Sequence, residues 1–121
     1  MARQSDDLCE AVSRWEIQLR KGVLEFAILL SLRGCERYGF ELISLVAKRA
    51  ALDVPEGTLY PLLLRLAKDG LVTSRLSDGG GGAPRKYYAM SSQGERLLEG
   101  MIPSWAQLAS SVDRLLSGES A

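Results

Sequence analysis

The sequence contains no histidine, which removes both the most common general base and the most common metal ligand. Its two cysteines, Cys9 and Cys35, form no CxxC pair, so neither a zinc site nor a disulfide framework is indicated. No apolar run approaches the roughly 20 residues that cross a bilayer, and no apolar segment of a signal peptide follows the charged start. We therefore expect a cytoplasmic protein with reduced cysteines, no metal, no cofactor and no membrane contact.

Catalytic patterns are also missing. The 121 residues suit one domain, and 46% hydrophobic with 25% charged residues is typical of a globular chain rather than a disordered one. Neither a paired-carboxylate site nor a nucleophile beside a base is recognisable, and the glycine run at 79–82 lacks the Lys-Ser/Thr and following helix of a phosphate-binding loop. We expect no enzyme and no catalytic residues.

Charge is balanced overall but not along the chain. Fifteen basic and fifteen acidic residues give zero net charge, whereas residues 37–88 hold eight basic residues against five acidic ones. Five of those eight lie between Arg65 and Lys86. A local excess of this size is usually a solvated surface, so by itself it does not indicate a nucleic-acid partner.

Helical periodicity covers the first half of the chain. Residues 6–32 are predicted to be helical, with a division into two pieces near Gly22 left open, and a second helix is expected at about 38–51. A third helix follows, with leucines at i, i+3, i+4 and i+7 on its core face: Leu59, Leu62, Leu63 and Leu66. Its opposite side carries Pro61, Leu64, Arg65 and Lys68, and Gly70 ends it.

The period then changes to that of extended chain. Residues 71–76 and 85–90 are rich in β-branched, aromatic and basic side chains, and the glycine-rich segment 77–84 separates them. Two such runs joined by a turn predict a β-hairpin, here with a long and loose tip.

The last segment is predicted to be a long helix that begins with a capping box at Ser92 and Glu95. Apolar residues then recur in steps of three and four, which is the pattern of a helix–helix seam: Leu98, Met101, Trp105, Leu108, Val112 and Leu115. A domain this small has little surface to cover the seam, so we expect a second copy of the chain to cover it and form a homodimer.

Three helices, a hairpin and a long helix make a mainly α (α+β) fold, the winged helix-turn-helix, with a β-hairpin wing and a long C-terminal dimerisation helix. We expect an N-terminal helical extension at 1–14, the winged-helix domain at 15–91 with its wing at 71–90, and the dimerisation helix at 92–121. In this fold the third helix enters the major groove of double-stranded DNA and the wing lies along the backbone.

Specific motifs support this layout: YGFEL at 38–42, GTLYPLL at 57–63, DGL at 69–71, PRKYY at 84–88 and Gly94. In their order and separation they resemble the PadR family of bacterial transcription regulators, over about residues 20–116. The resemblance implies a homodimeric repressor that binds an inverted-repeat operator and dimerises through its last helix. The length is similar to that of the short subclass, which has a single C-terminal helix.

The resemblance also implies DNA contacts where the motifs match. On the third helix these are Gly57, Thr58, Tyr60, Pro61, Arg65 and Lys68, and on the wing Arg85 and Lys86. Tyr87 and Tyr88 alternate between the faces of their strand, so one packs inward, and we expect Tyr88 to reach the DNA. Leu64 departs from the family, which commonly has a basic residue there; it either touches a thymine methyl or weakens phosphate contact.

Two tryptophans have open roles. In short PadR proteins that bind drugs, a tryptophan matching Trp105 stacks planar aromatic ligands at the dimer interface, which implies a small aromatic effector; the alternative is an anchor in the dimer seam. Trp15 either lines the same cavity or, as we prefer, is a core aromatic residue. For the whole protein, the alternative is a winged-helix protein–protein interaction module without DNA binding.

Overall fold

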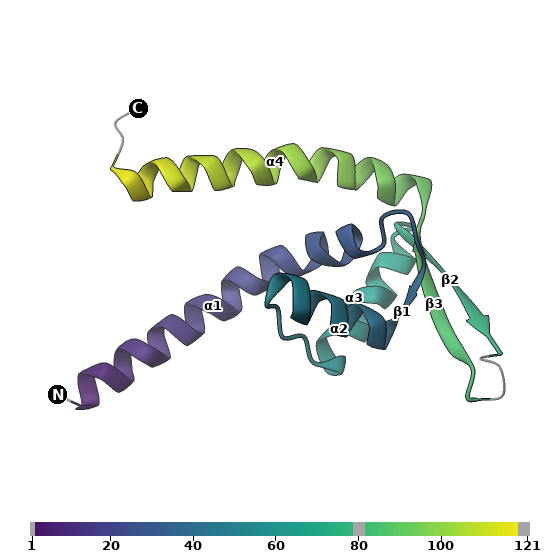
Figure 1. The fold of residues 1–121 in the computed structure, drawn as a ribbon, viewed down its shortest axis with the longest axis horizontal. Coiled ribbons are helices and arrows are strands. Elements are labelled where there is room, and N and C mark those ends of the chain that lie inside the picture. Colours follow the sequence, from purple (N-terminus) through teal and green to yellow (C-terminus); the bar gives the residue numbers. More distant parts are fainter. Residues whose placement is uncertain (1, 79–81, 119–121) are drawn as a thin grey trace.

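The computed structural model describes residues 2–78 and 82–118. Three helices, α1 (Ala2–Ser31), α2 (Gly39–Ala50) and α3 (Glu56–Lys68), precede strands β2 (Val72–Ser77) and β3 (Arg85–Met90), and α4 (Ser92–Ser117) follows. A short strand, β1 (Arg37–Tyr38), lies between α1 and α2. The mainly α winged-helix architecture predicted from the sequence is confirmed (Figure 1). The tip of the hairpin at 79–81, expected to be loose, lies outside the described residues.

Helix α1 runs through Gly22 without interruption, so the division into two pieces does not occur. Its N-terminal half extends away from α2 and α3, while its C-terminal half packs beside them (Figure 1). Among the helices within the described ranges, none is long and apolar enough to span a bilayer.

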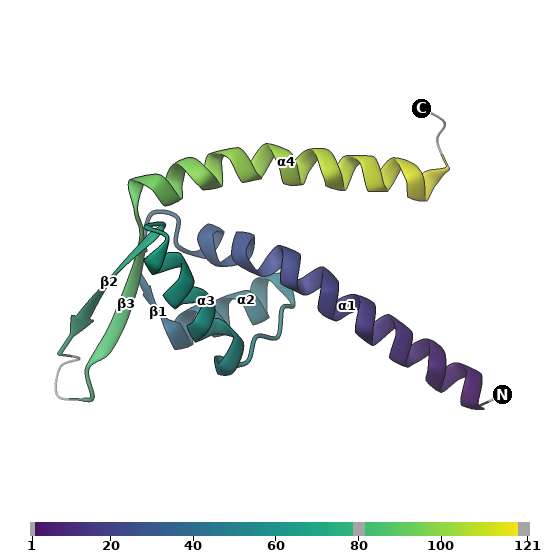
Figure 2. The same ribbon diagram turned by 180° about the vertical axis from the view of Figure 1, so that it is seen from behind.

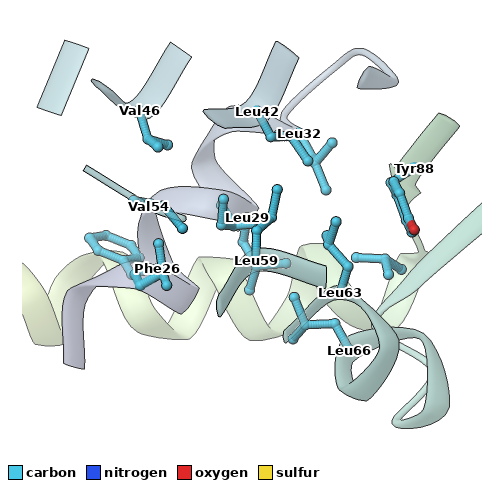
Figure 3. Packing of buried hydrophobic residues seen from close by; sticks show 14 of the residues in the cluster. Phe26, Leu29, Leu32, Leu42, Val46, Val54, Leu59, Leu63, Leu66 and Tyr88 are labelled. Atoms are coloured by element: carbon cyan, nitrogen blue, oxygen red, sulfur yellow. The ribbon is translucent and has the colours of Figure 1, made fainter. Parts of the chain in front are cut away.

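The core lies where α1, α2 and α3 meet (Figure 3). Its fully buried side chains come from the C-terminal half of α1, from α2 and from the predicted inner face of α3: Ile28, Leu29, Leu32, Leu42, Leu59, Leu63 and Leu66. Val72 and Tyr88 from the sheet and Leu98 from α4 complete the same cluster. Because α3 and the two strands of the wing contribute to one core, their positions relative to each other are fixed.

The sheet has three strands in the order β1-β3-β2, all antiparallel. Tyr38 of β1 pairs with Tyr87 and is also the residue that caps the start of α2. The pairing therefore ties the base of the wing to the beginning of α2, and this third strand was not predicted from the sequence.

Helix α4 is seated on the junction between α3 and β2. Ser91, rather than the predicted Ser92, is its N-cap: its Oγ accepts from the backbone N of Gly94 at 3.1 Å and donates to the Gly70 carbonyl at 2.7 Å. A Cβ added at Gly94 would overlap the Leu71 carbonyl oxygen, so only glycine allows this approach. The first turn of α4 is thus attached directly to the end of the third helix.

From that seat α4 runs above α1, and the two helices diverge toward the chain termini (Figures 1 and 2). At the middle of α4 they are in contact, since the rings of Phe26 and Trp105 lie with centroids 5.9 Å apart. Toward the termini each helix presents apolar residues that the chain does not cover.

Candidate nucleic-acid interface

The outward face of α3 is exposed because its leucines at the core spacing face inward. Thr58, Pro61 and Lys68 are exposed there, together with Gly57 in the first turn. Leu64 lies on the same face and is 68% exposed, a large apolar side chain beside Pro61 and Lys68. The predicted orientation of the helix is therefore confirmed, whereas its contacts with DNA stay a prediction.

Tyr60 lies across the start of α2. A Cβ built on Gly39 would be 2.5 Å from the Tyr60 hydroxyl oxygen and 2.7 Å from Cε1, so the ring occupies space that a side chain at Gly39 would need. The residue keeps 43% of its surface exposed. Tyr60 therefore packs α3 against α2 and still presents part of its ring to the surface.

Arg65 is already engaged within the chain. Its Nη2 lies 3.3 Å from Glu25 Oε2 on α1, and its Nη1 lies 3.6 Å from Asp69 Oδ2. Exposed pairs of this kind contribute only about 0–1 kcal/mol, so the guanidinium can leave them at little cost. Lys68 has no ion pair within residues 2–78 and 82–118.

The two basic residues of the wing project from opposite faces of β3. The Arg85 guanidinium carbon lies 4.6 Å from the centroid of Tyr38, whereas Lys86 Nζ lies 5.9 Å from the ring of Tyr88 on the other face. Alternation along a strand produces this separation. Arg85 and Lys86 therefore cannot act as one patch on a single face.

The prediction that Tyr88 reaches DNA is wrong. Its side chain is 6% exposed and belongs to the core cluster, because the register places it on the inner face of β3. Burial, with the neighbouring Tyr60, raises the pKa of the Tyr88 phenol above its usual value, so the group stays neutral. Tyr87 is the tyrosine on the outer face, and it is half-buried.

The outer face of the sheet carries an ion pair continued by aromatic contacts. Arg75 Nε donates to Glu36 Oε2 at 2.9 Å, and the Arg75 guanidinium lies 4.9 Å from the ring of Tyr87. Tyr87 meets Tyr38 edge to face, with centroids 5.6 Å apart. The hydrogen bond from Arg75 lowers the pKa of the Glu36 carboxyl. These four residues, called the brace below, link β2 through β3 to β1, and no spacing in the sequence indicated them.

A groove of about 520 Å³ lies between α1 and the first two thirds of α4. It is lined by Gly22, Val23, Phe26, Arg96, Leu97, Gly100, Met101, Ser104, Trp105 and Leu108. Trp105 lines this groove, and ligand binding there stays a prediction. Lining of a cavity between two copies of the chain by Trp15 likewise stays a prediction. Trp15 is not among the groove residues and is 62% exposed, so the prediction that it packs in the core is wrong. Its place on the extended half of α1 is the reason.

The predicted seam of α4 divides in two. Leu98 is 2% exposed, so the chain covers it itself and its assignment to a dimer seam is wrong. Met101 is half-buried and also lines the groove, so its assignment stays a prediction. The rest of the seam is exposed: Trp105, Leu108, Val112 and Leu115. A second exposed seam, with steps of four, three and four, lies on α1 and was readable in the sequence but not predicted: Leu8, Val12, Trp15 and Leu19.

In the part of the chain that the structure describes, no three histidine, cysteine or acidic residues are grouped so as to hold a metal ion.

Comparison with known proteins gives consistent matches. Residues 28–100 match the transcriptional regulator PadR-like family. A PadR family transcriptional regulator from Eggerthella lenta is 34% identical, covers 95% of this chain and 98% of its own, and superposes with a TM-score of 0.82. A PadR-like transcriptional regulator from Bacillus cereus is 40% identical and covers 84% of this chain and 99% of its own, with a TM-score of 0.76.

A third similar structure contains nucleic acid. It is Bacillus subtilis PadR in complex with operator DNA, 27% identical, with a TM-score of 0.62. The match covers 66% of this chain and 46% of that protein.

Proposed function

Because this chain belongs to the transcriptional regulator PadR-like family, we propose that it binds operator DNA as a homodimer and represses transcription in the cytoplasm. The observation that carries the proposal is the exposed outward face of α3 beside a wing with basic residues near its tip. A protein of this kind binds and does not catalyse.

The outward face of α3 enters the major groove. Thr58 and the backbone N of Gly57 contact phosphate at the helix N-terminus, Tyr60 and Pro61 lie against the groove wall, and Lys68 contacts backbone further along. Leu64 fits a thymine methyl, since it is a large apolar side chain that is 68% exposed on that face.

Arg65 gives up its ion pair with Glu25 and donates hydrogen bonds to the edge of a base. Arg65→Ala then lowers operator affinity by about 1–3 kcal/mol, the range for a bidentate base contact. Glu25→Gln is the matched variant: it removes the ion pair to α1, keeps the guanidinium and leaves only the contact with Asp69, so affinity is equal or higher. Loss of affinity in Glu25→Gln equal to that in Arg65→Ala would mean that the ion pair, not a base contact, is what binding requires.

The wing contacts phosphates from both of its faces, Lys86 on one and Arg85 on the other. Each phosphate contact contributes about 0.9 to the slope of log affinity against log salt concentration. Lys86→Ala and Arg85→Ala each reduce that slope by about this amount on every DNA sequence. An unchanged slope for either variant would remove that residue from the backbone contacts.

The exposed seams of α1 and α4 are the dimer surface, since both are apolar and neither is covered by the chain itself. A two-fold dimer presents two α3 helices to successive major grooves. The operator is then an inverted repeat with half-sites about 10 bp apart.

The groove beside Trp105 takes a planar aromatic effector that stacks on the indole. Binding there favours one of two dimer arrangements and releases DNA. The alternative, that Trp105 only anchors the dimer, is tested by fluorescence: titration with a planar aromatic dye quenches Trp105 in Trp15→Phe under the first proposal and leaves it unchanged under the second.

The deciding experiment is titration of the purified protein onto its own labelled upstream DNA at two salt concentrations, with a scrambled duplex as competitor. Tight binding that resists the competitor and weakens steeply with salt supports an autoregulating repressor. Binding no tighter than to the scrambled duplex, on this and on genome-wide fragments, would contradict sequence-specific regulation.

A second candidate function is a winged-helix module for protein–protein contact. The zero net charge and exposed Leu64 favour it. A partner bound through apolar surface dissociates little as salt rises, in contrast to DNA, so the same two-salt titration separates the two functions.

A further inference from the structure

A second concave region, formed by α1, β1, α2 and the turn after α1, lies apart from α3 and the wing. It has a volume of about 260 Å³ and is lined by Leu30, Ser31, Arg33, Arg37, Leu45 and Arg49. Three arginines from three successive parts of the chain thus meet: one follows α1, one is in β1, and one is in the last turn of α2. No carboxylate lines the region.

These arginines differ in their pairing from three other arginines of the chain, although Arg85 is likewise without an ion pair among the described residues. Arg20, Arg65 and Arg75 each form an ion pair with a carboxylate, whereas none of the three does so within the described ranges. The nearby carboxylates are engaged elsewhere: Glu36 binds Arg75, and Glu41 Oε1 accepts from the backbone N of Tyr38 at 3.1 Å. Within the described ranges, none of the three guanidinium groups therefore forms an ion pair with a carboxylate.

Arg37 holds a defined position in the cluster. Its Nε donates to the Ser31 carbonyl at 2.7 Å, which orients the guanidinium and leaves its two terminal nitrogens as donors. Its backbone is fixed by pairing with Tyr88. The residue is half-buried, and the leucine walls reduce the solvent that would screen its charge.

Stabilisation of helix C-termini explains part of this arrangement. Arg49 in the last turn of α2 and Arg33 just after α1 both lie where a cation interacts favourably with the helix dipole. Arg37, in a strand, gains nothing from a helix end, and the dipole does not explain why all three line one cavity.

We propose that Arg33, Arg37 and Arg49 form a binding site for a small phosphorylated molecule, with a diphosphate group as the recognised unit. The planar guanidinium matches phosphate oxygens in pairs, and several arginines around one anion are the usual means of holding more than one negative charge. No residue of α3, β2 or β3 lines the site, so it stays open when DNA occupies the proposed interface. Arg37 belongs to β1, which pairs directly with β3 of the wing, so the ligand would lie next to the wing.

The test is calorimetric titration of the full-length protein with inorganic pyrophosphate at constant ionic strength. Arg37→Gln and Arg49→Gln are each expected to weaken binding about tenfold or more, because each removes charge-assisted hydrogen bonds. Arg114→Gln is the matched control: Arg114 is also exposed in the last turn of a helix, α4, and is expected to leave affinity unchanged. Absence of pyrophosphate binding, or equal loss in the control, would overturn the proposal.

Two further measurements keep the test decisive. Arg37→Lys keeps the charge but loses the forked geometry, so we expect intermediate affinity, with circular dichroism confirming that the fold is intact. The source of the phosphate is separated by the salt slope of operator binding: a free ligand leaves that slope unchanged in Arg49→Gln. If the wild-type protein does not bind pyrophosphate and Arg49→Gln reduces the salt slope of operator binding by about one, the site binds the DNA backbone instead and the proposal is overturned.

Discussion

The head of the molecule and the two helix ends that extend from it bury their apolar side chains to very different extents. The head comprises the C-terminal half of α1 with α2, α3 and the sheet, and seven of its large apolar residues are almost fully buried. The helix ends, residues 4–19 of α1 and 105–117 of α4, expose theirs at helical spacing. The head meets its own packing requirement, whereas the helix ends require another surface.

This contrast explains why one chain shows both a complete core and two uncovered seams. Burial of apolar surface stabilises by about 25 cal/mol per Å². The exposed seams of the two helices would therefore contribute to stability only when another surface covers them. Mutations in the two regions should therefore differ in kind: those in the head change the stability of the fold, and those in the helix ends change association.

The largest expected effect is in the head. Leu63→Ala removes a fully buried side chain and leaves a cavity, so the free energy of unfolding should fall by about 2–5 kcal/mol in urea titration. Leu64→Ala, the next residue along α3, is exposed and should change stability by no more than about 0.5 kcal/mol. Equal effects of the two substitutions would contradict the burial that defines the head.

A charge in the helix ends should act on association instead. Leu108→Asp places a carboxylate in the exposed seam of α4, so the dimer should be weakened by about 2–4 kcal/mol while far-ultraviolet circular dichroism shows unchanged helix content. Light scattering coupled to size exclusion measures the mass. Gln107→Asp, beside it but off the seam, is the control and should stay dimeric; a wild-type protein that is monomeric at all concentrations would remove the contrast.

A smaller effect is expected where the two regions join. Ser91→Ala removes the N-cap of α4 and should cost about 1 kcal/mol of unfolding free energy, measured in urea. Ser92→Ala is the matched control, because Ser92 is exposed and its side chain does not cap the helix. Equal losses would mean that the cap is not what secures this joint.

The smallest effect concerns the brace, which is outside the buried core. Because the folded-state pKa of Glu36 is lowered, its contribution to stability is present above the usual carboxyl pKa of 4.5 and disappears as pH falls through the folded value. Glu36→Gln should therefore lower the melting temperature slightly at pH 7, and the difference should shrink as the pH is lowered below 4.5. A difference that persists at acidic pH would exclude the ion pair as its cause.

Regular periodicity explains which parts of this fold could be predicted from the sequence. Four leucines at helical spacing defined the inner and outer faces of α3, and the change to extended pattern located the wing. The strand β1 has two residues, too few for any period, and exists because it pairs with β3.

Contacts between distant segments explain the rest. Glu25 and Arg65 are 40 positions apart, so their pairing depends on how α1 crosses α3. The spacing of Leu98 with Trp105 identified a common face of α4 but not which surface covers each residue. Likewise, alternation showed that one of Tyr87 and Tyr88 faces inward, and only the register decides which.

The seat of α4 on the head has a mechanical consequence. Ser91 and Gly94 hold the first turn of α4 directly against the end of α3, so a change in the tilt of α4 moves its far end relative to the head. Its 26 residues correspond to about 39 Å at about 1.5 Å per residue. Over that length, a tilt of about 5° moves the far end by about 3 Å, a full hydrogen-bond distance. A slight rearrangement among the apolar side chains at the end of α4 is thereby magnified into a repositioning of the entire head.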